Sequence, residues 1–330
     1  MPKLKLSLAC WNYDRTRTLL DGQIQPDGID LTCLDLPVEE IFFRMLRHHE
    51  FDVAEMSLSS YVLTRFSDPH PFIAIPVFPS RFFRHSCIYV HRDSGIKNPQ
   101  DLAGKRVGTP EFQMTAGVWI RGILSDEYKV PVSSPSYFTG GEESPGREEK
   151  IALSLPPEMK VQPIPSDKTL SIMIADGEID AVYAARKPST YTGGDCPVQR
   201  LFPDYYAVER AYFQKTGIFP IMHTVVIRTE VYEKHRWVAQ SLCKAFGTAQ
   251  RKAYDDLKET TALKTMLPWL PRHLEETQQL MGEDFWPYGL ESSEHTLDTF
   301  LRYSYEQGLS KRRLEARELF SPESLESFTI

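Results

Sequence analysis

The sequence lacks the features that mark membrane proteins and nucleic-acid-binding proteins. It has no uninterrupted apolar run near the roughly 20 residues that a membrane-spanning helix needs. Asp and Glu outnumber Lys and Arg by 45 to 38, so the net charge is −7 and no basic excess is present to bind a nucleic-acid backbone. We therefore expect neither a membrane nor a nucleic acid among the partners of this chain.

Cysteine is scarce, and its spacing excludes the common disulfide and metal motifs. The five cysteines are odd in number and widely spaced, with no CxxC pair, which is typical of a reducing compartment. The segment Met1–Lys5 runs directly into Leu4, Leu6 and Leu8 of a predicted strand, without the charged and apolar regions of a signal peptide. Both observations favour a cytoplasmic protein.

Strand and helix signals alternate along most of the 330 residues, which predicts an α/β protein with mostly parallel sheets. The chain is long enough for two domains, and its 41% hydrophobic and 25% charged residues are ordinary for a folded protein. The predicted strands are Lys3–Cys10, Ile29–Leu34, Phe51–Met56, Lys105–Gly108, Ile179–Tyr183 and Thr224–Arg228. The predicted helices begin at Pro37 and at Ser166 or Asp167, and span 113–124, 229–257 and 294–307, with a mobile loop over 132–150.

The order of these elements predicts two lobes joined by two crossing segments. Residues 1–87 and 219–330 would form a discontinuous first lobe with the C-terminal helices, and residues 88–218 an inserted second lobe. In such folds ligands lie between the lobes, beyond the carboxyl ends of the strands. We expect the ligand site there.

Several sequence runs resemble known families. The runs Leu102–Gly108 and Gly177–Ala181 resemble type II periplasmic binding proteins, a likeness that concerns fold rather than function. Longer runs are similar to the 4,5-dihydroxyphthalate decarboxylase family over nearly the whole chain. They are Val38–Phe42, Phe51–Ser57, Pro79–Ser86, Gly108–Ala116, Phe219–His223 and Trp286–Gly289.

This resemblance implies a cytoplasmic carboxy-lyase of aromatic catabolism that converts 4,5-dihydroxyphthalate to protocatechuate and CO2. The partner would be a small anionic aromatic substrate. Decarboxylation of so electron-rich a ring has no obligatory cofactor, so we expect none. The chain is compatible with a homo-oligomer, and its sequence does not define the number of subunits.

Chemistry and expected position nominate the residues that would bind this dianion. Arg81, Arg84 and Arg186 could each hold a carboxylate through two parallel hydrogen bonds, although most arginines pair with surface carboxylates. Residues at the start of a predicted helix, whose free N–H groups attract anions, could receive the second carboxylate or simply cap the helix. These residues are Thr109, Gln113 and Thr115.

Proton transfer to the ring carbon requires an acid that titrates near the working pH. His85 and His223 lie on the two predicted crossing segments and would converge, and Glu55 ends a predicted strand. A histidine in such a position is as often a core or hinge residue. A second alternative is that the three residues bind a divalent ion, but they lack a local metal motif such as HExxH.

Three further residues face the expected ligand site. Ser57 and Ser59 lack a GxSxG motif, so they are predicted to hydrogen-bond the ligand or cap a helix rather than act as nucleophiles. Trp11 follows the first strand and is predicted to contact the substrate.

Two other functions fit the same fold. A solute-binding protein for an aromatic or dicarboxylate ligand would need export and no proton donor. Another cytoplasmic enzyme of this fold, such as a chorismate dehydratase, resembles the chain only at the level of the fold.

Overall fold

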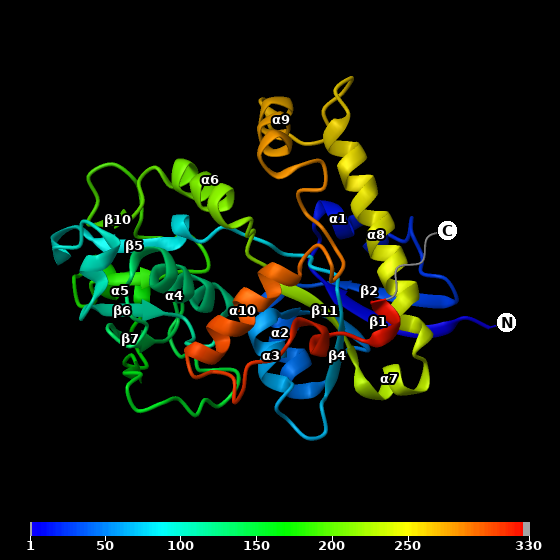
Figure 1. Ribbon diagram of the computed structural model, residues 1–330, viewed down its shortest axis with the longest axis horizontal. Coiled ribbons are helices and arrows are strands. Elements are labelled where there is room, and N and C mark those ends of the chain that lie inside the picture. The colour runs from blue at the N-terminus through cyan, green and yellow to red at the C-terminus, as the bar shows by residue number, and fades with distance from the viewer. Residues whose placement is uncertain (1, 326–330) are drawn as a thin grey trace. The chain divides into compact units, whose positions relative to one another are not determined.

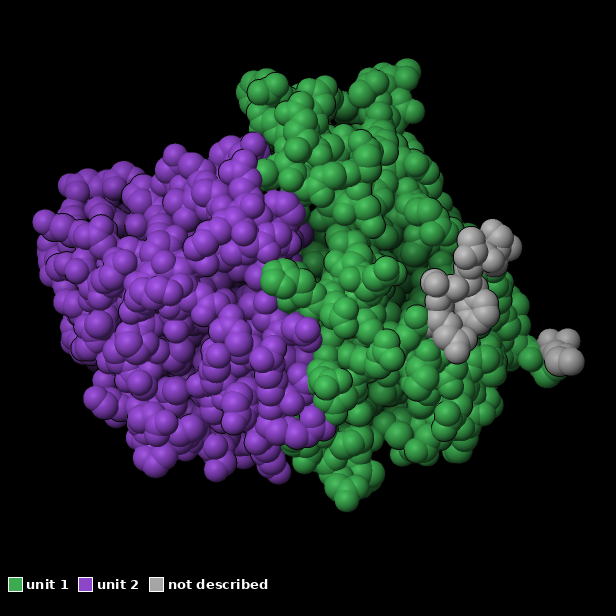
Figure 2. Space-filling view, in the orientation of Figure 1, with its two compact units in different colours: residues 1–81, 221–297, 315–330 green, residues 82–220, 298–314 purple. Residues whose placement is uncertain are grey.

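The computed structural model describes residues 2–325, which divide into two compact units (Figure 2). The first unit comprises the residues up to Arg81, Ile221–Leu297 and the residues from Glu315, and the second comprises Phe82–Pro220 and Asp298–Leu314. The predicted boundaries, 87/88 and 218/219, lie a few residues from those of the units. The prediction differs for residues 298–314, which it placed in the first lobe and which belong to the second unit.

Strands and helices of the first unit follow one another closely along the chain (Figure 1). Within the described residues they are β1 (Leu4–Cys10), α1 (Asp14–Leu20), β2 (Ile29–Asp35), α2 (Val38–His48), β3 (Val53–Ser57), α3 (Leu58–Thr64), β4 (Phe72–Ile75), β11 (His223–Arg228), α7 (Thr229–Lys234), α8 (Trp237–Lys258) and α9 (Leu270–Met281). The five strands form one sheet in the order β2-β1-β3-β11-β4. β1 is parallel to β2 and β3, whereas β11 is antiparallel to β3 and β4.

The core of the first unit lies between this sheet and α8. Alternate residues of β1 point into it, as the period of two along a strand requires, and α8 contributes an apolar face at helical spacing. The members of this core include Leu6, Leu8, Val238, Leu242, Ala245, Phe246 and Ala249. The packing holds the carboxyl ends of β1 and β3 in place, and the candidate site is built on those ends.

The second unit is built on a six-stranded mixed sheet in the order β10-β5-β9-β6-β7-β8. Its elements are β5 (Ile88–His91), β6 (Arg106–Thr109), α4 (Thr115–Tyr128), β7 (Ser136–Thr139), β8 (Val161–Pro163), α5 (Leu170–Ala175), β9 (Ala181–Tyr183), β10 (Val198–Arg200) and α6 (Tyr205–Thr216). The strands from β9 to β8 run parallel, and β5 is antiparallel to β9 and β10.

The last long helix, α10 (Glu294–Glu306), begins in the first unit and ends in the second. Its second half packs on α4, where the ring of Tyr303 lies edge-on to Trp119 with centroids 5.6 Å apart. A Cβ at Gly122 of α4 would lie 2.1 Å from the Tyr303 ring, so only glycine permits this approach. These contacts explain why residues 298–314 belong to the second unit.

Four sequence predictions about secondary structure need correction. Both sheets are mixed, because β11 and β5 enter their sheets antiparallel. The second sheet is still mostly parallel, as predicted, whereas the first has as many antiparallel as parallel pairings. The segment 132–150, predicted as a loop, contains β7. The helix predicted over 229–257 is interrupted between α7 and α8. The helix predicted to start at Ser166 or Asp167 begins after Thr169, whose side chain caps it. Four helices, α1, α3, α6 and α9, were not predicted.

Among residues 2–325, no helix has both the length and the apolar character that crossing a lipid bilayer would require.

Candidate functional site

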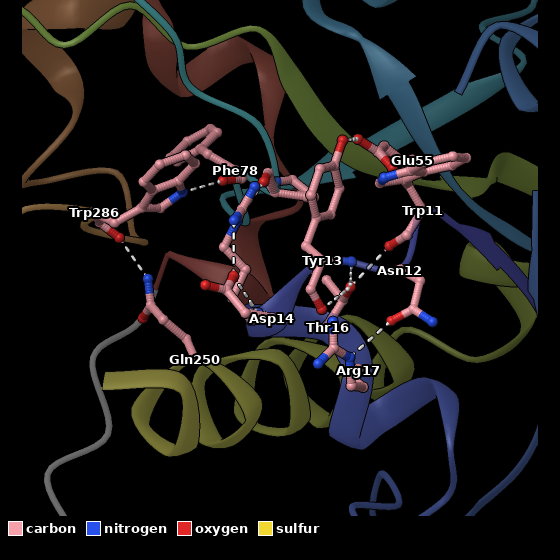
Figure 3. Close-up of polar contacts among 12 residues, drawn as sticks. Trp11, Asn12, Tyr13, Asp14, Thr16, Arg17, Glu55, Phe78, Gln250 and Trp286 are labelled. Atoms are coloured by element: carbon pink, nitrogen blue, oxygen red, sulfur yellow. Dashed lines mark hydrogen bonds and ion pairs between the residues drawn. The ribbon is translucent and has the colours of Figure 1, made fainter. Parts of the chain in front are cut away.

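A fully buried carboxylate, Glu55, lies in β3 and accepts hydrogen bonds from several groups. Its Oε1 accepts from the Tyr13 hydroxyl at 2.7 Å and lies 2.6 Å from Nδ1 of His223 (Figure 3 shows the Tyr13 bond). Its Oε2 accepts from the backbone N–H of Trp11 at 3.0 Å and from the Cys10 thiol at 3.6 Å. Both oxygens of the carboxylate are therefore occupied by protein donors.

The register of β3 and β11 places His223 beside Glu55. Glu55 pairs with Val225, and His223 precedes Val225 by two residues, so its side chain lies on the same face of the sheet. The imidazole also packs edge-on against Phe42, with ring centroids 4.9 Å apart. The His223 side chain is 16% exposed and that of Glu55 is 0% exposed. The imidazole is therefore the accessible member of the pair.

The hydrogen bonds decide the protonation of this group. Burial alone would raise the pKa of Glu55, but the hydrogen bond and charge of His223, with the bonds from Trp11 and Tyr13, hold that pKa below its ordinary value. Burial and the nearby Glu55 charge raise the pKa of the Tyr13 hydroxyl and of the Cys10 thiol. Glu55 is thus an ionised acceptor surrounded by groups that keep their protons.

Arg15, at the start of α1, extends the same group of residues. Its guanidinium carbon lies 4.2 Å from the ring centroid of Tyr13 and 4.1 Å from that of Trp286 (Figure 3 labels both rings). Its Nε donates to the carbonyl of Pro79 at 2.6 Å, and its Nη1 bonds Asp14 at 2.9 Å. The two rings and the carbonyl fix the position of a cation that the sequence analysis did not nominate.

A cavity of about 130 Å³ lies beside Arg15. Its walls come from the start of α1, from one face of α8 and from the segment before α10. The lining residues are Asp14, Arg15, Gln250, Ala253, Tyr254, Leu257, Phe285 and Trp286. The guanidinium therefore borders open space with aromatic walls.

Arg81, predicted to bind a carboxylate, is buried in the first unit. It is 4% exposed, and its Nη2 donates to the carbonyl of Pro287 at 2.7 Å and to the Ser293 hydroxyl at 2.9 Å. Burial lowers the pKa of Arg81 to about 10. These contacts connect the end of the first crossing segment to the C-terminal part of the chain.

The remaining nominated residues of the first unit lie around Glu55. Trp11 is 41% exposed, and its backbone N–H donates to Glu55. Ser57 ends β3 and Ser59 enters α3, and both side chains are buried. Ser57 occupies the N-cap position of α3 without a side-chain cap bond.

In the second unit, a second fully buried carboxylate, Glu111, lies just before α4. Arg147 donates to its Oε1 through Nε at 2.9 Å and Nη2 at 2.6 Å, and Lys150 forms a further ion pair with it. Gln113 donates to its Oε2 at 2.8 Å. Burial would raise the pKa of Glu111, but the charges of Lys150 and Arg147 lower it below the ordinary value.

Of the residues predicted to receive the second substrate carboxylate, one contacts this protein carboxylate and the other two lie close to it in the chain. Gln113 bonds it directly, the Thr109 hydroxyl donates to the Glu111 carbonyl at 3.3 Å, and Thr115 is the first residue of α4. Met114 occupies the N-cap position, so the helix is capped by none of the nominated residues.

His85 lies in a cluster of aromatic rings in the second unit. Its ring centroid is 5.2 Å from that of Tyr212 and 5.3 Å from that of Phe202. The side chain is 1% exposed, and neither ring nitrogen has a hydrogen-bond partner among the described residues. Burial lowers the pKa of His85 to about 4, so its imidazole is neutral near pH 7. It has no proton to give at that pH as an imidazolium.

The two other nominated arginines lie in the second unit with different surroundings. Arg84 is 7% exposed, donates to the Ala185 carbonyl at 3.3 Å and lies 5.0 Å from the Phe82 ring centroid. Arg186 is exposed, and its charge acts on two acidic neighbours, Glu142 and Glu143.

Glu142 is buried and its Oε1 has no hydrogen-bond partner in the described part of the chain. Burial raises its pKa to about 7, although Arg186 acts in the opposite direction. The adjacent Glu143 accepts from the hydroxyls of Ser171 and Ser189, both at 2.6 Å. Burial would raise the pKa of Glu143, but these bonds lower it.

The structure therefore joins two of the three nominated catalytic residues, Glu55 and His223. The sequence analysis missed Tyr13, Arg15, Glu111, Arg147, Lys150 and Glu142. The only available signal was position, because Tyr13 and Arg15 fall in the segment after the first strand. Across residues 2–325, no group of three or more His, Cys, Asp and Glu side chains is arranged to hold a metal ion.

Comparisons with known proteins come from both sequence and structure. The chain is 45% identical to a 4,5-dihydroxyphthalate decarboxylase of Comamonas testosteroni over 330 residues, which is 100% of each chain. It is 47% identical over 204 residues to a protein of the same name from Pseudomonas putida, covering 62% of this chain and 79% of that one. No protein-family profile matches the chain.

The fold is similar to that of the periplasmic aliphatic sulphonate-binding protein of Escherichia coli. The TM-score is 0.55 at 13% identity, and the match covers 97% of this chain and 98% of the other. At this identity the likeness concerns the fold alone. It confirms the predicted α/β class and the periplasmic-binding-protein-like fold, in which helices flank two sheets that the structure shows to be mixed.

Proposed function

Because the chain belongs to the 4,5-dihydroxyphthalate decarboxylase family, we propose that it converts 4,5-dihydroxyphthalate to 3,4-dihydroxybenzoate (protocatechuate) and CO2. The observation that carries this proposal is the 45% identity to a decarboxylase of that name over the full length of both chains. The activity is that of a carboxy-lyase of aromatic catabolism, acting on a small anionic aromatic substrate.

The substrate supplies most of the chemistry. Each carboxylate is para to a hydroxyl, so loss of the phenolic proton sends electron density to the carbon that bears the carboxylate. A proton added to that carbon makes it tetrahedral, the bond to the carboxylate then breaks, and CO2 leaves as the ring regains its aromaticity. The enzyme must therefore deliver one proton to a ring carbon and stabilise the phenolate.

His223 has the environment that this proton transfer requires. Glu55 bonds its Nδ1, which leaves Nε2 as the ring nitrogen that exchanges a proton with a ligand. The hydrogen bond to the ionised Glu55 holds the imidazole in one orientation. His85 lacks such a partner, so we assign the proton donor to His223 rather than to both histidines.

We propose that the reaction uses no metal or organic cofactor, because the hydroxyl-bearing ring itself supplies the electron density that protonation of the ring carbon requires. Binding of a divalent ion by Glu55 and His223 is the alternative, and a chelator tests it. We also propose a cytoplasmic location. All five cysteines of the chain are free thiols, which is typical of a reducing compartment.

The direct test is to incubate the purified protein with 4,5-dihydroxyphthalate, with and without a chelator, and to follow the aromatic product and CO2. We expect one CO2 for each 3,4-dihydroxybenzoate formed, at the same rate in both conditions. Phthalate is the matched control, since it has both carboxylates but no hydroxyl to release electron density, and it should not react.

Binding of 4,5-dihydroxyphthalate without consumption, even after added divalent metal, would contradict the enzyme and favour a solute-binding protein. Loss of turnover in chelator with recovery on added metal would overturn the proposal that no metal takes part.

A further inference from the structure

A second charged group stands next to the Glu55–His223 pair in the first unit. We propose that Arg15 binds the carboxylate that the substrate keeps, and so determines which of its two carboxylates is lost. This inference rests on the proposed decarboxylase function and assigns a specificity role to a residue outside the nominated set.

The contacts of Arg15 leave one edge of its guanidinium for a ligand. The rings of Tyr13 and Trp286 cover its faces, at 4.2 and 4.1 Å, and the carbonyl of Pro79 takes Nε. One of the two hydrogens on Nη1 bonds Asp14, and the Asp14 side chain is 52% exposed. Nη2 and the second hydrogen of Nη1 form the fork that accepts a carboxylate through two parallel bonds.

The surroundings of Arg15 give a carboxylate room beside its ion pair with Asp14. The side chain borders the cavity of about 130 Å³, close in volume to an apolar cavity of about 150 Å³ that is known to admit benzene. Arg81 differs, because its Nη2 is engaged by Pro287 and Ser293 and its side chain is buried. Arg15 borders a cavity.

Tyr13 connects Arg15 to the proton-transfer pair. Its ring stacks on the guanidinium, and its hydroxyl donates to the same Oε1 of Glu55 that bonds His223. One side chain therefore separates the cation from the Glu55–His223 pair.

Electrostatics indicate which carboxylate Arg15 binds. A cation on the departing carboxylate would stabilise the ground state and be lost in the transition state, where that group becomes neutral CO2. A cation on the retained carboxylate stabilises both states and positions the ring. Arg15 therefore binds the carboxylate that remains in the product.

The test compares two ligands that differ only in that carboxylate: 3,4-dihydroxybenzoate, which has it, and catechol, which does not. Their dissociation constants are measured by calorimetry for the wild type, Arg15→Met, Arg15→Lys and Arg17→Met. Arg17 is the matched control, since it lies on the same helix and its Nε donates to Oδ1 of Asn12 at 3.3 Å. Thermal melting checks that each variant is folded.

We expect the wild type and Arg17→Met to prefer 3,4-dihydroxybenzoate over catechol by about tenfold or more, as a desolvated carboxylate–guanidinium contact does. Arg15→Met should reduce that ratio to near one while catechol affinity stays unchanged, and Arg15→Lys should restore part of it. An unchanged ratio in Arg15→Met overturns the inference, even if the wild type is an active decarboxylase. Failure of the wild type to consume 4,5-dihydroxyphthalate is a separate result that removes the proposed function.

Discussion

Glu55 of the first unit is buried in a different way from His85 and Glu142 of the second unit. In the first, Glu55 is fully buried with donors on both oxygens, and those donors hold its pKa below the ordinary value. In the second unit, His85 and Glu142 are also buried. Among residues 2–325, the two ring nitrogens of His85 and Oε1 of Glu142 have no hydrogen-bond partner. Burial then favours the neutral form of each, lowering the pKa of His85 to about 4 and raising that of Glu142 to about 7.

This difference separates residues that transfer protons from residues that couple protonation to stability. Glu55 stays ionised because its hydrogen bonds hold its pKa below the ordinary value, and its partner His223 is partly exposed. An unpaired buried group releases or takes up its proton only at a cost to the folded state. Changes in the first unit should therefore alter turnover, and changes in the second should alter the pH dependence of unfolding.

The largest expected effect comes from exchanging the histidine of each unit for glutamine. His223→Gln removes the proton donor, so kcat should fall by about 10²–10⁴-fold, with a much smaller change in the affinity for 4,5-dihydroxyphthalate. His85→Gln should change kcat by less than about tenfold, because a neutral imidazole among aromatic rings gives up no proton near pH 7. Steady-state kinetics and calorimetry on both variants measure the contrast. Equal losses of kcat in the two variants would contradict the different roles of the two histidines.

A smaller effect is expected from Glu142→Gln in the second unit. The folded pKa of Glu142, about 7, lies above its unfolded value of 4.5, so its contribution to stability is present below pH 4.5 and is lost as the pH rises through 7. Between pH 5 and 8 the wild type should lose about 2–3 kcal/mol of unfolding free energy from this group. Glutamine has no proton to lose, so the unfolding free energy of the variant should not fall by this amount.

Urea unfolding at pH 5 and pH 8 measures this difference. Glu143→Gln is the matched control, because its neighbouring carboxylate is hydrogen-bonded by Ser171 and Ser189 and its pKa is lowered. If the stability of the wild type and that of Glu142→Gln change by the same amount between these pH values, Glu142 is not protonated in the folded state.

The smallest of the three effects is at His85 and has the opposite sign with pH. Its folded pKa of about 4 lies below the unfolded value of 6.5, so its stabilising contribution is present above pH 6.5 and is lost as the pH falls toward 4. Between pH 7.5 and 5 this amounts to about 2 kcal/mol. His85→Phe, which suits the aromatic surroundings, should be less sensitive to acid over that range in the same urea assay. Identical acid sensitivity in the two proteins would place a partner on the imidazole.

The sequence predicted those parts of the site that depend on strand ends. Glu55 was nominated because it ends a predicted strand, and His223 because it lies on the second predicted crossing segment. The antiparallel register of β3 and β11 brings the two together. Arg15 and Tyr13 could not be nominated in the same way. Their roles come from contacts with Pro79 and Trp286, which are far away in the chain and have no local pattern.

Charged contacts across a segment rich in Ser, Pro and Gly were also missed. Residues 132–150 have the composition of a mobile loop, yet Arg147 and Lys150 pair with Glu111, and Glu143 bonds Ser171 and Ser189. The break between α7 and α8 contains no Pro or Gly. The helical spacing of apolar residues continues across it, so the sequence predicted one helix. Local composition does not predict where such long-range partners lie.

The position of β11 in its sheet sets an order of events during synthesis. β11 lies between β3 and β4, and the residues that separate it from β4 in the chain include the whole Phe82–Pro220 portion of the second unit. Contacts across so long a stretch form late, because the entropy of closing a long loop must be overcome first. The hydrogen bond between Glu55 and His223 spans 168 residues. On a ribosome, the chain would thus carry a sheet with an unfilled central position, and an incomplete proton-transfer pair, until the residues of β11 have emerged.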